Sequence, residues 1–173
     1  MFTKPGEIVK YLKDKKYITT NMNGADFGCG SGYFSVLLAQ SVLPSGTIYA
    51  IDILEDELKS AQEFANNLGV KNIRFLRQDL EKNSGLANNQ VDFVFISQVL
   101  YQSKEPQKII KEAFRVIKNS GFLIVYEPQA SNFLFSGQKV HSQEEIEKIC
   151  TEIGFKILER KEYPGFYLLV FQK

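Results

Sequence analysis

Short apolar runs with strand character alternate with helical segments along this chain, and this alternation limits its possible folds more than any other feature. The strand-like runs cover residues 46–53, 72–77, 91–97 and 122–127. The helical patterns between them cover residues 31–42, 54–68 and 106–118. Parallel strands need a crossover connection, which helices of this length supply. The alternation therefore predicts an α/β fold in which helices cover both faces of a mostly parallel sheet.

The start of the chain completes this pattern. A first strand is expected at about residues 22–27, because the helix over 31–42 must follow a strand for the alternation to begin. Before it, residues 1–17 combine charged and apolar side chains and predict a helix that begins near Pro5. No internal repeat or linker divides the sequence, so residues 1–173 are expected to form a single domain.

The C-terminal part of the chain departs from the alternation. Ser142 and Glu145 have the spacing of a capping box, which predicts that a helix begins there. Two strands, at residues 155–161 and 166–171, are joined by the turn signal Tyr-Pro-Gly at residues 163–165. A tight turn makes successive strands antiparallel, so the sheet is expected to end with an antiparallel strand.

Composition and charge narrow the possible functions. Hydrophobic residues make up 44% of the 173 residues and charged residues 24%, which is typical of a globular domain. The formal charge of +1 provides no basic excess for nucleic acid, and no apolar run reaches the length of a membrane span. Cys29 and Cys150 are too few for a disulfide framework and lack metal-ligand spacing with the single histidine, His141. We therefore expect a cytoplasmic protein without a metal or a membrane contact; the charge gives no support for a nucleic-acid partner, although it does not exclude RNA.

A glycine-rich segment lies where the first strand should end and the first long helix begin. It consists of Asp26, Phe27, Gly28, Cys29, Gly30, Ser31 and Gly32. Glycine permits positive φ angles and close approach of a ligand to the backbone, and the first N–H groups of the following helix attract an anionic group. Ligands of parallel sheets bind at such turns. The segment predicts a ligand-binding loop; the alternative is a tight turn without a ligand, in which Cys29 is simply a small residue that fits.

Two acids follow the next two strands. Asp52 stands 24 positions after Gly28, near the spacing at which a carboxylate accepts hydrogen bonds from the two hydroxyls of a ribose. Asp79 follows the strand over 72–77 and suits the exocyclic amine of adenine, with Leu80 packed on the base. The alternatives are a solvated acid at the strand end for Asp52 and a helix-capping or loop acid for Asp79. Together with the glycine-rich segment, these acids predict a nucleoside site.

Two kinds of nucleoside-binding protein fit these features, and the spacing of the glycines separates them. A dinucleotide oxidoreductase uses G-x-G-x-x-G around a pyrophosphate, whereas this chain has G-x-G-x-G over residues 28–32, preceded by Asp26. A carboxylate beside the loop repels a pyrophosphate but favours a ligand that carries a cationic amine. The pattern therefore favours S-adenosylmethionine (SAM) over NAD.

With these residues and the strand over 91–97, the chain resembles the class I SAM-dependent methyltransferases, in particular the UbiE-like enzymes and the methyltransferase-domain family. The resemblance extends from about Pro5 to Lys173. It implies a Rossmann-like seven-stranded sheet of order 3-2-1-4-5-7-6 with the last strand antiparallel, and a helix over residues 1–17 that covers the cofactor site. It also implies SAM as the cofactor and S-adenosylhomocysteine as its product.

The resemblance further implies a role for each matching residue. For the methionine part of SAM these residues are Asp26, Gly28, Cys29, Gly30, Ser31 and Gly32; for the ribose, Asp52; for adenine, Ile53, Asp79 and Leu80; and near the reacting methyl group, Ser97 and Gln98. None of these roles involves a metal ion.

The expected reaction is an in-line SN2 transfer of the methyl group to a small-molecule acceptor. The sulfonium already activates the methyl group, so the protein mainly aligns the acceptor, and a base is needed only if the acceptor must lose a proton. The candidates near the mouth of the site are His141, Tyr101, Tyr126 and Glu127. Alternatively, His141 merely flanks the helix cap at Ser142, and Glu127 is a solvated acid at a strand end. Tyr101 and Tyr126 are alternatively packed aromatic residues.

The acceptor pocket is expected between the N-terminal helix, the loop over 98–105 and the segment over 128–141. In that segment, Phe133, Leu134 and Phe135 either line an apolar pocket or lid, or belong to an ordinary loop packed on the sheet. No D/N-P-P-F/Y sequence follows the fourth strand, which weighs against N-methylation of a nucleic-acid base. Methylation of protein or RNA, or binding of SAM without turnover, stays open, as do a monomer and a homodimer.

Overall fold

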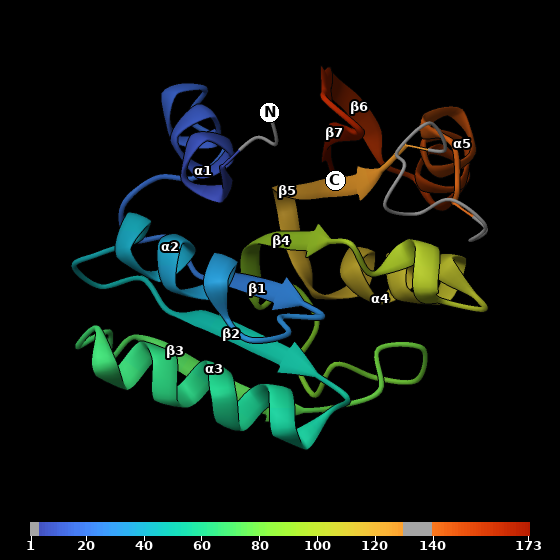
Figure 1. The fold of residues 1–173 in the computed structure, drawn as a ribbon. Helices are drawn as coiled ribbons and strands as arrows, with labels where there is room; N and C mark the ends of the chain where they lie inside the picture. Colours follow the sequence, from blue (N-terminus) through green and yellow to red (C-terminus); the bar gives the residue numbers. More distant parts are fainter. Residues whose placement is uncertain (1–3, 130–139) are drawn as a thin grey trace.

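The computed structural model describes residues 4–129 and 140–173, which form one seven-stranded sheet with helices on both sides (Figure 1). The strands are β1 (Gly24–Phe27), β2 (Ile48–Asp52), β3 (Ile73–Arg77), β4 (Val91–Ser97), β5 (Ile117–Pro128), β6 (Lys156–Tyr163) and β7 (Phe166–Gln172). The helices are α1 (Pro5–Asp14), α2 (Tyr33–Ser41), α3 (Glu55–Asn67), the short 3₁₀ helix η1 (Leu100–Gln102), α4 (Pro106–Val116) and α5 (Gln143–Ile153). Every strand and helix predicted from the sequence is present, with differences at the ends.

The strand order is β3-β2-β1-β4-β5-β7-β6, which confirms the predicted fold and topology. Strands β3, β2, β1, β4 and β5 pair in parallel, whereas β7 is antiparallel to both β5 and β6. The turn between β6 and β7 contains Gly165, whose φ of 77° is accessible to glycine and suits the tight turn expected there.

This strand order places a crevice near the centre of the sheet. β1 lies between β2 and β4, so the connections that leave β1 and β4 diverge toward opposite sides of the sheet. The arrowheads of β1, β2 and β4 point the same way in Figure 1, and the carboxyl ends of these strands share one edge. Ligands of open α/β sheets bind at such a topological switch point.

Apolar side chains cover both faces of the sheet. Along β4, Phe93 and Phe95 belong to the core under α1 and α2, while Val94 and Ile96 belong to the core under α4 and α5. This alternation follows from the two-residue period of a strand that is buried on both sides. A fully buried side chain of this size contributes about 1.5–3 kcal/mol relative to an exposed one, so these two layers supply much of the stability of the fold.

The start of α5 is built as the sequence indicates. Ser142 Oγ accepts a hydrogen bond from the backbone N–H of Glu145 at 3.2 Å, and Glu145 Oε2 accepts one from the backbone N–H of Ser142 at 2.9 Å. The predicted capping box is therefore confirmed. Within the described ranges, no helix is both long enough and apolar enough to cross a bilayer.

The boundary between α4 and β5 differs from the prediction. The sequence pattern extends the helix to residue 118 and begins the strand at 122, but α4 ends at Val116 and β5 begins at Ile117. Ile117 has an extended backbone, pairs with Val91 of β4 and is fully buried. A β-branched side chain packs well in a sheet, so burial of Ile117 there outweighs two more residues of helix.

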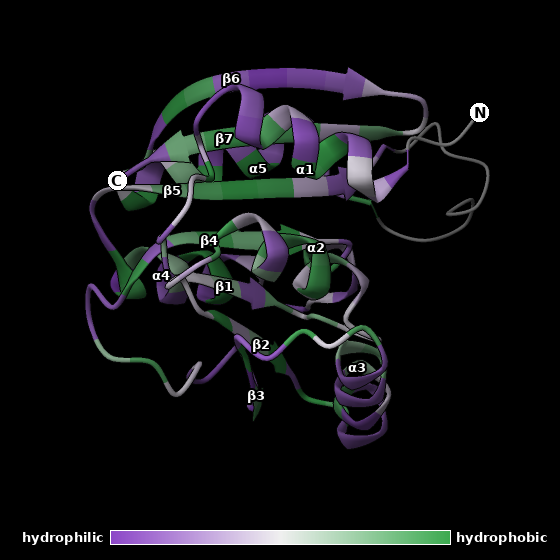
Figure 2. Cartoon of the chain, turned by 90° about the vertical axis from the view of Figure 1, so that its left-hand side faces the viewer, coloured by the Kyte–Doolittle hydropathy of each residue, from purple (hydrophilic) through white to green (hydrophobic). Residues whose placement is uncertain are grey.

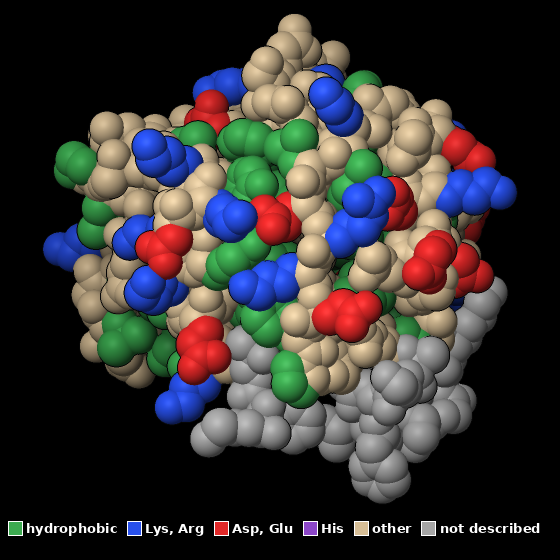
Figure 3. Space-filling view, turned by 90° about the horizontal axis from the view of Figure 1, so that it is seen from above, with side chains coloured by type: hydrophobic (Ala, Val, Ile, Leu, Met, Phe, Trp, Pro, Cys, Tyr) green, Lys and Arg blue, Asp and Glu red, His purple; other side chains and the backbone are tan. Residues whose placement is uncertain are grey.

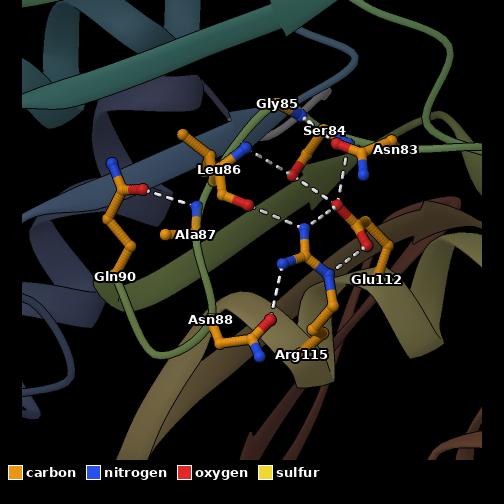
Figure 4. A network of polar contacts seen from close by, with 9 residues as sticks. All are labelled: Asn83, Ser84, Gly85, Leu86, Ala87, Asn88, Gln90, Glu112 and Arg115. Atoms are coloured by element: carbon orange, nitrogen blue, oxygen red, sulfur yellow. Dashed lines mark hydrogen bonds and ion pairs between the residues drawn. The ribbon is translucent and has the colours of Figure 1, made fainter.

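The connection from β3 to β4 contains no helix, but hydrogen bonds tie it to α4 (Figure 4). Glu112 is only 8% exposed and accepts hydrogen bonds from the backbone N–H of Ser84 at 2.7 Å and from Ser84 Oγ at 2.5 Å. Arg115 donates to Glu112 at 2.6 and 2.8 Å, to the Leu86 carbonyl at 2.8 Å and to Asn88 Oδ1 at 2.7 Å. We call these five residues the crossover network.

Strand β6 forms one edge of the sheet and is rich in charged residues. They are Lys156, Glu159, Arg160, Lys161 and Glu162. In Figure 2, β6 is largely hydrophilic while its neighbour β7 and strand β5 are largely hydrophobic. The register with β7 shifts between Ile157 and Glu159, which marks a bulge.

Two helices contact β6 from either side. Tyr11 of α1 and Tyr17, which follows this helix, donate hydrogen bonds from their hydroxyls to Glu159, at 2.7 and 2.9 Å. Arg160 forms an ion pair with Glu147 of α5. Figure 3 looks onto the molecule from this side and shows acidic and basic side chains interspersed over the face.

Candidate functional site

A cavity of about 770 Å³ opens at the carboxyl ends of β1, β2 and β4, at the topological switch point. The loop after β1, the ends of β2 and β3, and the segment after β4 line it. Its size lies in the range of small-molecule sites. The fold therefore provides a ligand cavity where the glycine-rich segment predicts one.

The glycine-rich segment folds as a tight turn against β2 and the segment after β4. Gly28 and Cys29 donate backbone hydrogen bonds to the carbonyl of Ile51, at 2.8 and 3.0 Å. Gly28 has a φ of 75°, and a Cβ at this position would lie 2.3 Å from Val99 Cγ2. Only glycine fits both this conformation and this approach. The turn thus holds its backbone open toward the cavity.

Asp52 lies directly against that turn. Asp52 Oδ2 accepts a hydrogen bond from the backbone N–H of Gly30 at 2.9 Å, and Oδ1 accepts one from the backbone N–H of Leu54 at 2.9 Å. Each carboxylate oxygen has two lone pairs, so both retain an acceptor site for a ligand. The structure therefore brings together the loop and the acid that the sequence pairs in one nucleoside site.

Asp26 lines the inner part of the cavity and is only 2% exposed. It accepts a hydrogen bond from Ser35 Oγ at 2.5 Å. Burial raises the pKa of Asp26 to about 7, the hydrogen bond from Ser35 lowers it, and the negative charge of Asp52 raises it further. A cation beside Asp26 would favour its ionised form.

Ile53, Asp79 and Leu80 also line the cavity. Ile53 is 53% exposed, so its apolar surface is available for a flat ligand to cover. Asp79 forms an ion pair with Lys82 at 2.9 Å, and this contact, ahead of other causes, lowers the pKa of Asp79. Leu80 is buried.

The segment after β4 forms the opposite wall. Ser97, Gln98 and Tyr101 line the cavity, together with Val99, which the sequence does not single out. Gln98 has a φ of 58°, an uncommon conformation for a residue with a side chain. Burial and then the charge of Glu127 raise the pKa of Tyr101. Its hydroxyl is therefore protonated near neutral pH.

Glu127 is not the solvated acid that one sequence interpretation allows. It is 1% exposed and accepts hydrogen bonds from the backbone N–H groups of Val99, Leu100 and Tyr101, at 2.8, 2.9 and 3.3 Å. It does not belong to the described cavity lining. Burial raises the pKa of Glu127 to about 7, while these three hydrogen bonds oppose the shift.

Several residues predicted near the site lie elsewhere. His141 is not among the described residues that line the cavity; its side chain is 14% exposed and lies 3.7 Å from Glu145 at the start of α5. Tyr126 is 5% exposed and stacks on Phe166 in the core. Helix α1 packs beside α2, and none of its residues lines the cavity among those described, so its covering role stays a prediction.

Two further expectations concern the chemistry of single residues and segments. Cys29 is buried at 9% exposure, and burial followed by the charge of Asp26 raises the pKa of its thiol, which keeps it unreactive. Phe133, Leu134 and Phe135 lie outside the described residues, so their role as a pocket wall or lid stays a prediction.

The first turn of α2 adds two lining residues that the sequence analysis missed. Tyr33 is 54% exposed and stacks on Phe64 of α3, with ring centroids 5.9 Å apart, and Phe34 beside it is half-buried. The signal was available, because two aromatic residues directly follow Gly32 at the start of the helix. They give this part of the cavity an aromatic surface.

The cavity has a pronounced charge imbalance. Its described lining contains five acids and one lysine: Asp26, Asp52, Glu57, Asp79, Glu81 and Lys104. Such a surface repels the phosphates of a dinucleotide and attracts a ligand that carries positive charge. A sulfonium together with an ammonium group matches this field.

Comparison with known proteins gives consistent matches. A family model described as Methyltransferase domain matches residues 18–166. A demethylmenaquinone methyltransferase of Geobacillus stearothermophilus is 26% identical over 124 residues, which are 68% of this chain and 53% of that protein. A ribosomal protein L11 methyltransferase of Carboxydothermus hydrogenoformans is 30% identical over 160 residues, which are 91% of this chain and 46% of that protein. The chain thus spans about half the length of these curated relatives.

A solved structure matches the whole fold. The crystal structure of a SAM-dependent methyltransferase from Aquifex aeolicus has a TM-score of 0.83 and 25% sequence identity, and the match covers 98% of both chains. The similarity therefore includes the sheet, both helical layers and the edge at which the cavity opens.

Proposed function

The chain belongs to the Methyltransferase domain family of class I SAM-dependent methyltransferases, and from this premise we propose that it transfers the methyl group of SAM to a small-molecule acceptor. One observation supports this proposal above the others. The carboxylate of Asp52 is hydrogen-bonded to the loop at Gly30, inside a cavity whose described lining is predominantly acidic. This arrangement suits a cationic nucleoside without phosphates, and of the two candidate cofactors only SAM lacks the pyrophosphate that such an acidic lining would repel.

Each lining residue has a proposed task. Asp52 accepts hydrogen bonds from the ribose hydroxyls, and Asp26 and the loop Gly28, Cys29, Gly30, Ser31 and Gly32 hold the methionine part. Ile53 and Leu80 cover adenine, Asp79 accepts from its amine, and Ser97 and Gln98 face the transferred methyl group. The first N–H groups of α2 favour the carboxylate of the methionine part.

The chain's own contribution to the reaction is alignment. When bound, SAM supplies a methyl group that is already activated by its sulfonium. The cavity walls hold the acceptor in line with that group, and good orientation of two reactants is worth about 7–11 kcal/mol of the barrier. Tyr101, whose raised pKa keeps its hydroxyl protonated, orients the acceptor by hydrogen bonding rather than by taking its proton. His141 stays a candidate base only for an acceptor that reaches the start of α5.

The acceptor is proposed to be small and partly apolar, because Phe34 and Tyr33 give the cavity an aromatic side. A protein acceptor is the second candidate, and the similarity to a ribosomal protein methyltransferase favours it. Turnover assays with a panel of small quinols, phenols and amines, and with ribosomal proteins, separate the two. Methyl transfer only to ribosomal proteins would contradict the small-molecule proposal.

Calorimetric titration with SAM and with S-adenosylhomocysteine tests the shared premise. We expect both to bind, and Asp52→Ala to weaken both by at least about tenfold, because hydrogen bonds to a charged group are worth about 1.5–3 kcal/mol each. Asp52→Asn serves as the matched variant, since it keeps one acceptor oxygen and should lose less affinity. Glu55→Gln, an exposed substitution three residues away, is the control. Absence of binding by the unaltered protein at millimolar ligand would overturn the proposal.

A further inference from the structure

Glu127 of β5 is hydrogen-bonded to the segment after β4, which forms one wall of the cavity. It sits near the end of β5, and its carboxylate accepts hydrogen bonds from three successive backbone N–H groups after β4, those of Val99, Leu100 and Tyr101. Since Glu127 is 1% exposed and does not line the cavity among the described residues, it can act on a ligand only through that segment.

The segment that Glu127 holds has an unusual shape. Gln98 has a left-handed backbone with a φ of 58°, and its N–H donates to the carbonyl of Tyr126 at 3.0 Å. Val99 then packs so closely on Gly28 that no side chain could be accommodated there. The hydrogen bonds of Glu127 begin at Val99, directly after the strained residue. These hydrogen bonds therefore offset the conformational free energy of the left-handed turn, which places Gln98 and Tyr101 in the cavity lining.

We infer that Glu127 is a positioning residue of the site, whose ionised carboxylate shapes the segment Ser97–Gln102 for cofactor binding. This inference rests on the proposed function, because it assumes that the cavity binds SAM and its product. Three converging N–H donors explain the choice of side chain. A carboxylate offers acceptors only, whereas a glutamine in the same place would turn an NH₂ group toward a donor.

The ionisation of Glu127 is within reach of ordinary buffers. Burial raises its pKa to about 7, against the effect of the three hydrogen bonds. Among the described side chains, two titratable groups interact electrostatically with Glu127. They are Tyr101 of η1 and Tyr167 of β7, the residue that pairs with Glu127 in the sheet. Burial raises the pKa of both tyrosines, so both are neutral near pH 7. Burial also raises the pKa of Asp26 to about 7, so the titration is repeated in Asp26→Asn, and a change in the segment between pH 6 and 8 that persists in this variant reports on Glu127.

The first experiment measures affinity for S-adenosylhomocysteine by calorimetry at pH 8, together with the melting temperature. We expect Glu127→Gln to bind at least about tenfold more weakly than the unaltered protein. The matched control is Glu112→Gln, because Glu112 is also buried and also accepts a backbone N–H, but lies away from the cavity. It should lose thermal stability and keep its affinity. Equal affinity of Glu127→Gln and the unaltered protein would overturn the inference; failure of the unaltered protein to bind would overturn the proposed function instead.

The second experiment needs no substitution at Glu127 and decides the matter if Glu127→Gln does not fold. The backbone amide signals of Val99 and Leu100 are followed by NMR from pH 5.5 to 8.5, with and without S-adenosylhomocysteine. Ligand binding and ionisation of Glu127 affect each other equally. A ligand that binds tenfold better when Glu127 is ionised therefore lowers the midpoint of the pH titration by about one pH unit. We expect a midpoint near 7 that falls when the ligand is added. The same midpoint with and without ligand would show that Glu127 serves the fold alone.

Discussion

The crossover network and the edge of the cavity both bury carboxylates, but they surround them differently. Glu112 of the crossover network is buried and paired with Arg115, a partly exposed side chain that donates to it at 2.6 and 2.8 Å. Asp26 and Glu127, at the edge of the cavity, accept hydrogen bonds only from a hydroxyl and from backbone N–H groups, and neither forms an ion pair with any described residue.

The pKa values follow from this difference. At Glu112, burial opposes ionisation, but the hydrogen bonds from Arg115 and Ser84 outweigh it and lower the pKa. At Asp26 and Glu127, burial dominates and raises the pKa to about 7. Folding therefore favours the ionised form of Glu112 and disfavours that of Asp26 and Glu127, and buried acids whose ionisation is disfavoured in this way are typical of functional sites. The presence or absence of a cationic partner therefore distinguishes the two kinds of buried carboxylate.

Breaking the crossover network should have the largest effect. In Arg115→Ala, Glu112 stays buried without its cation; loss of one partner of a fully buried pair costs about 3–5 kcal/mol, and this is an upper bound here because the Arg115 side chain is 32% exposed. Urea unfolding at pH 7 measures this loss, with Lys59→Ala, which removes an exposed ion pair, as the control. Affinity for SAM should be unchanged, because Arg115 does not line the cavity. A loss below about 1 kcal/mol would mean that Ser84 alone compensates the charge of Glu112.

Gly28 at the cavity and Gly85 beside the crossover network form a matched pair of glycines. Gly28 and Gly85 have similar φ angles of 75° and 80°, but a Cβ at Gly28 meets Val99 at 2.3 Å and one at Gly85 meets only the end of Gln78, at 3.2 Å. Gly85→Ala should cost about 1–2 kcal/mol for the left-handed backbone. Gly28→Ala should cost a further 1–3 kcal/mol, roughly, for overpacking, and should also weaken SAM binding. Equal costs in urea unfolding would contradict the close approach of Val99.

The third expected change in stability has the opposite sign, because a substitution at Asp26 should stabilise the fold. The raised pKa of Asp26 means that the native state takes up a proton more readily than the unfolded chain, so stability falls as pH rises from about 4 to about 7. Asp26→Asn removes this cost and should raise the free energy of unfolding at pH 8 by about 2 kcal/mol while weakening SAM binding. Urea unfolding at pH 5 and pH 8 measures how the free energy of unfolding changes with pH in the unaltered protein and in the variant. If the variant kept the pH dependence of the unaltered protein in full, Asp26 would not be its source.

Local patterns account for the parts of the fold that were predicted correctly. The capping box at Ser142, the turn at Gly165 and the glycines at 28–32 each depend on a few neighbouring residues, so their structure follows from short stretches of sequence. The strand order followed from the family resemblance and from the alternation of strands and helices. The pairing of Asp52 with the loop followed from its spacing, and the contact with Gly30 agrees with it.

Long-range packing accounts for what was missed. Glu127 follows an apolar strand just as Asp52 does, but η1 and β7 bury it, and nothing within its own strand indicates that depth. Glu112 meets Ser84 across 28 positions, so the crossover network has no local signature. The end of α4 was misplaced because the pairing of Ile117 with Val91 is likewise a contact between distant segments.

The charged, bulged edge at β6 has a consequence for how copies of this protein meet. An open edge strand usually offers unpaired backbone groups that a strand of another molecule can join, which is a common route to aggregation. Here the bulge at Ile157 and Glu159 interrupts the regular spacing of those groups, and the adjacent lysines and acids would have to lose their hydration before a guest strand could dock. These features disfavour the addition of a further strand at β6. Self-association of two copies at this edge is therefore expected to use side-chain contacts rather than a continuous sheet.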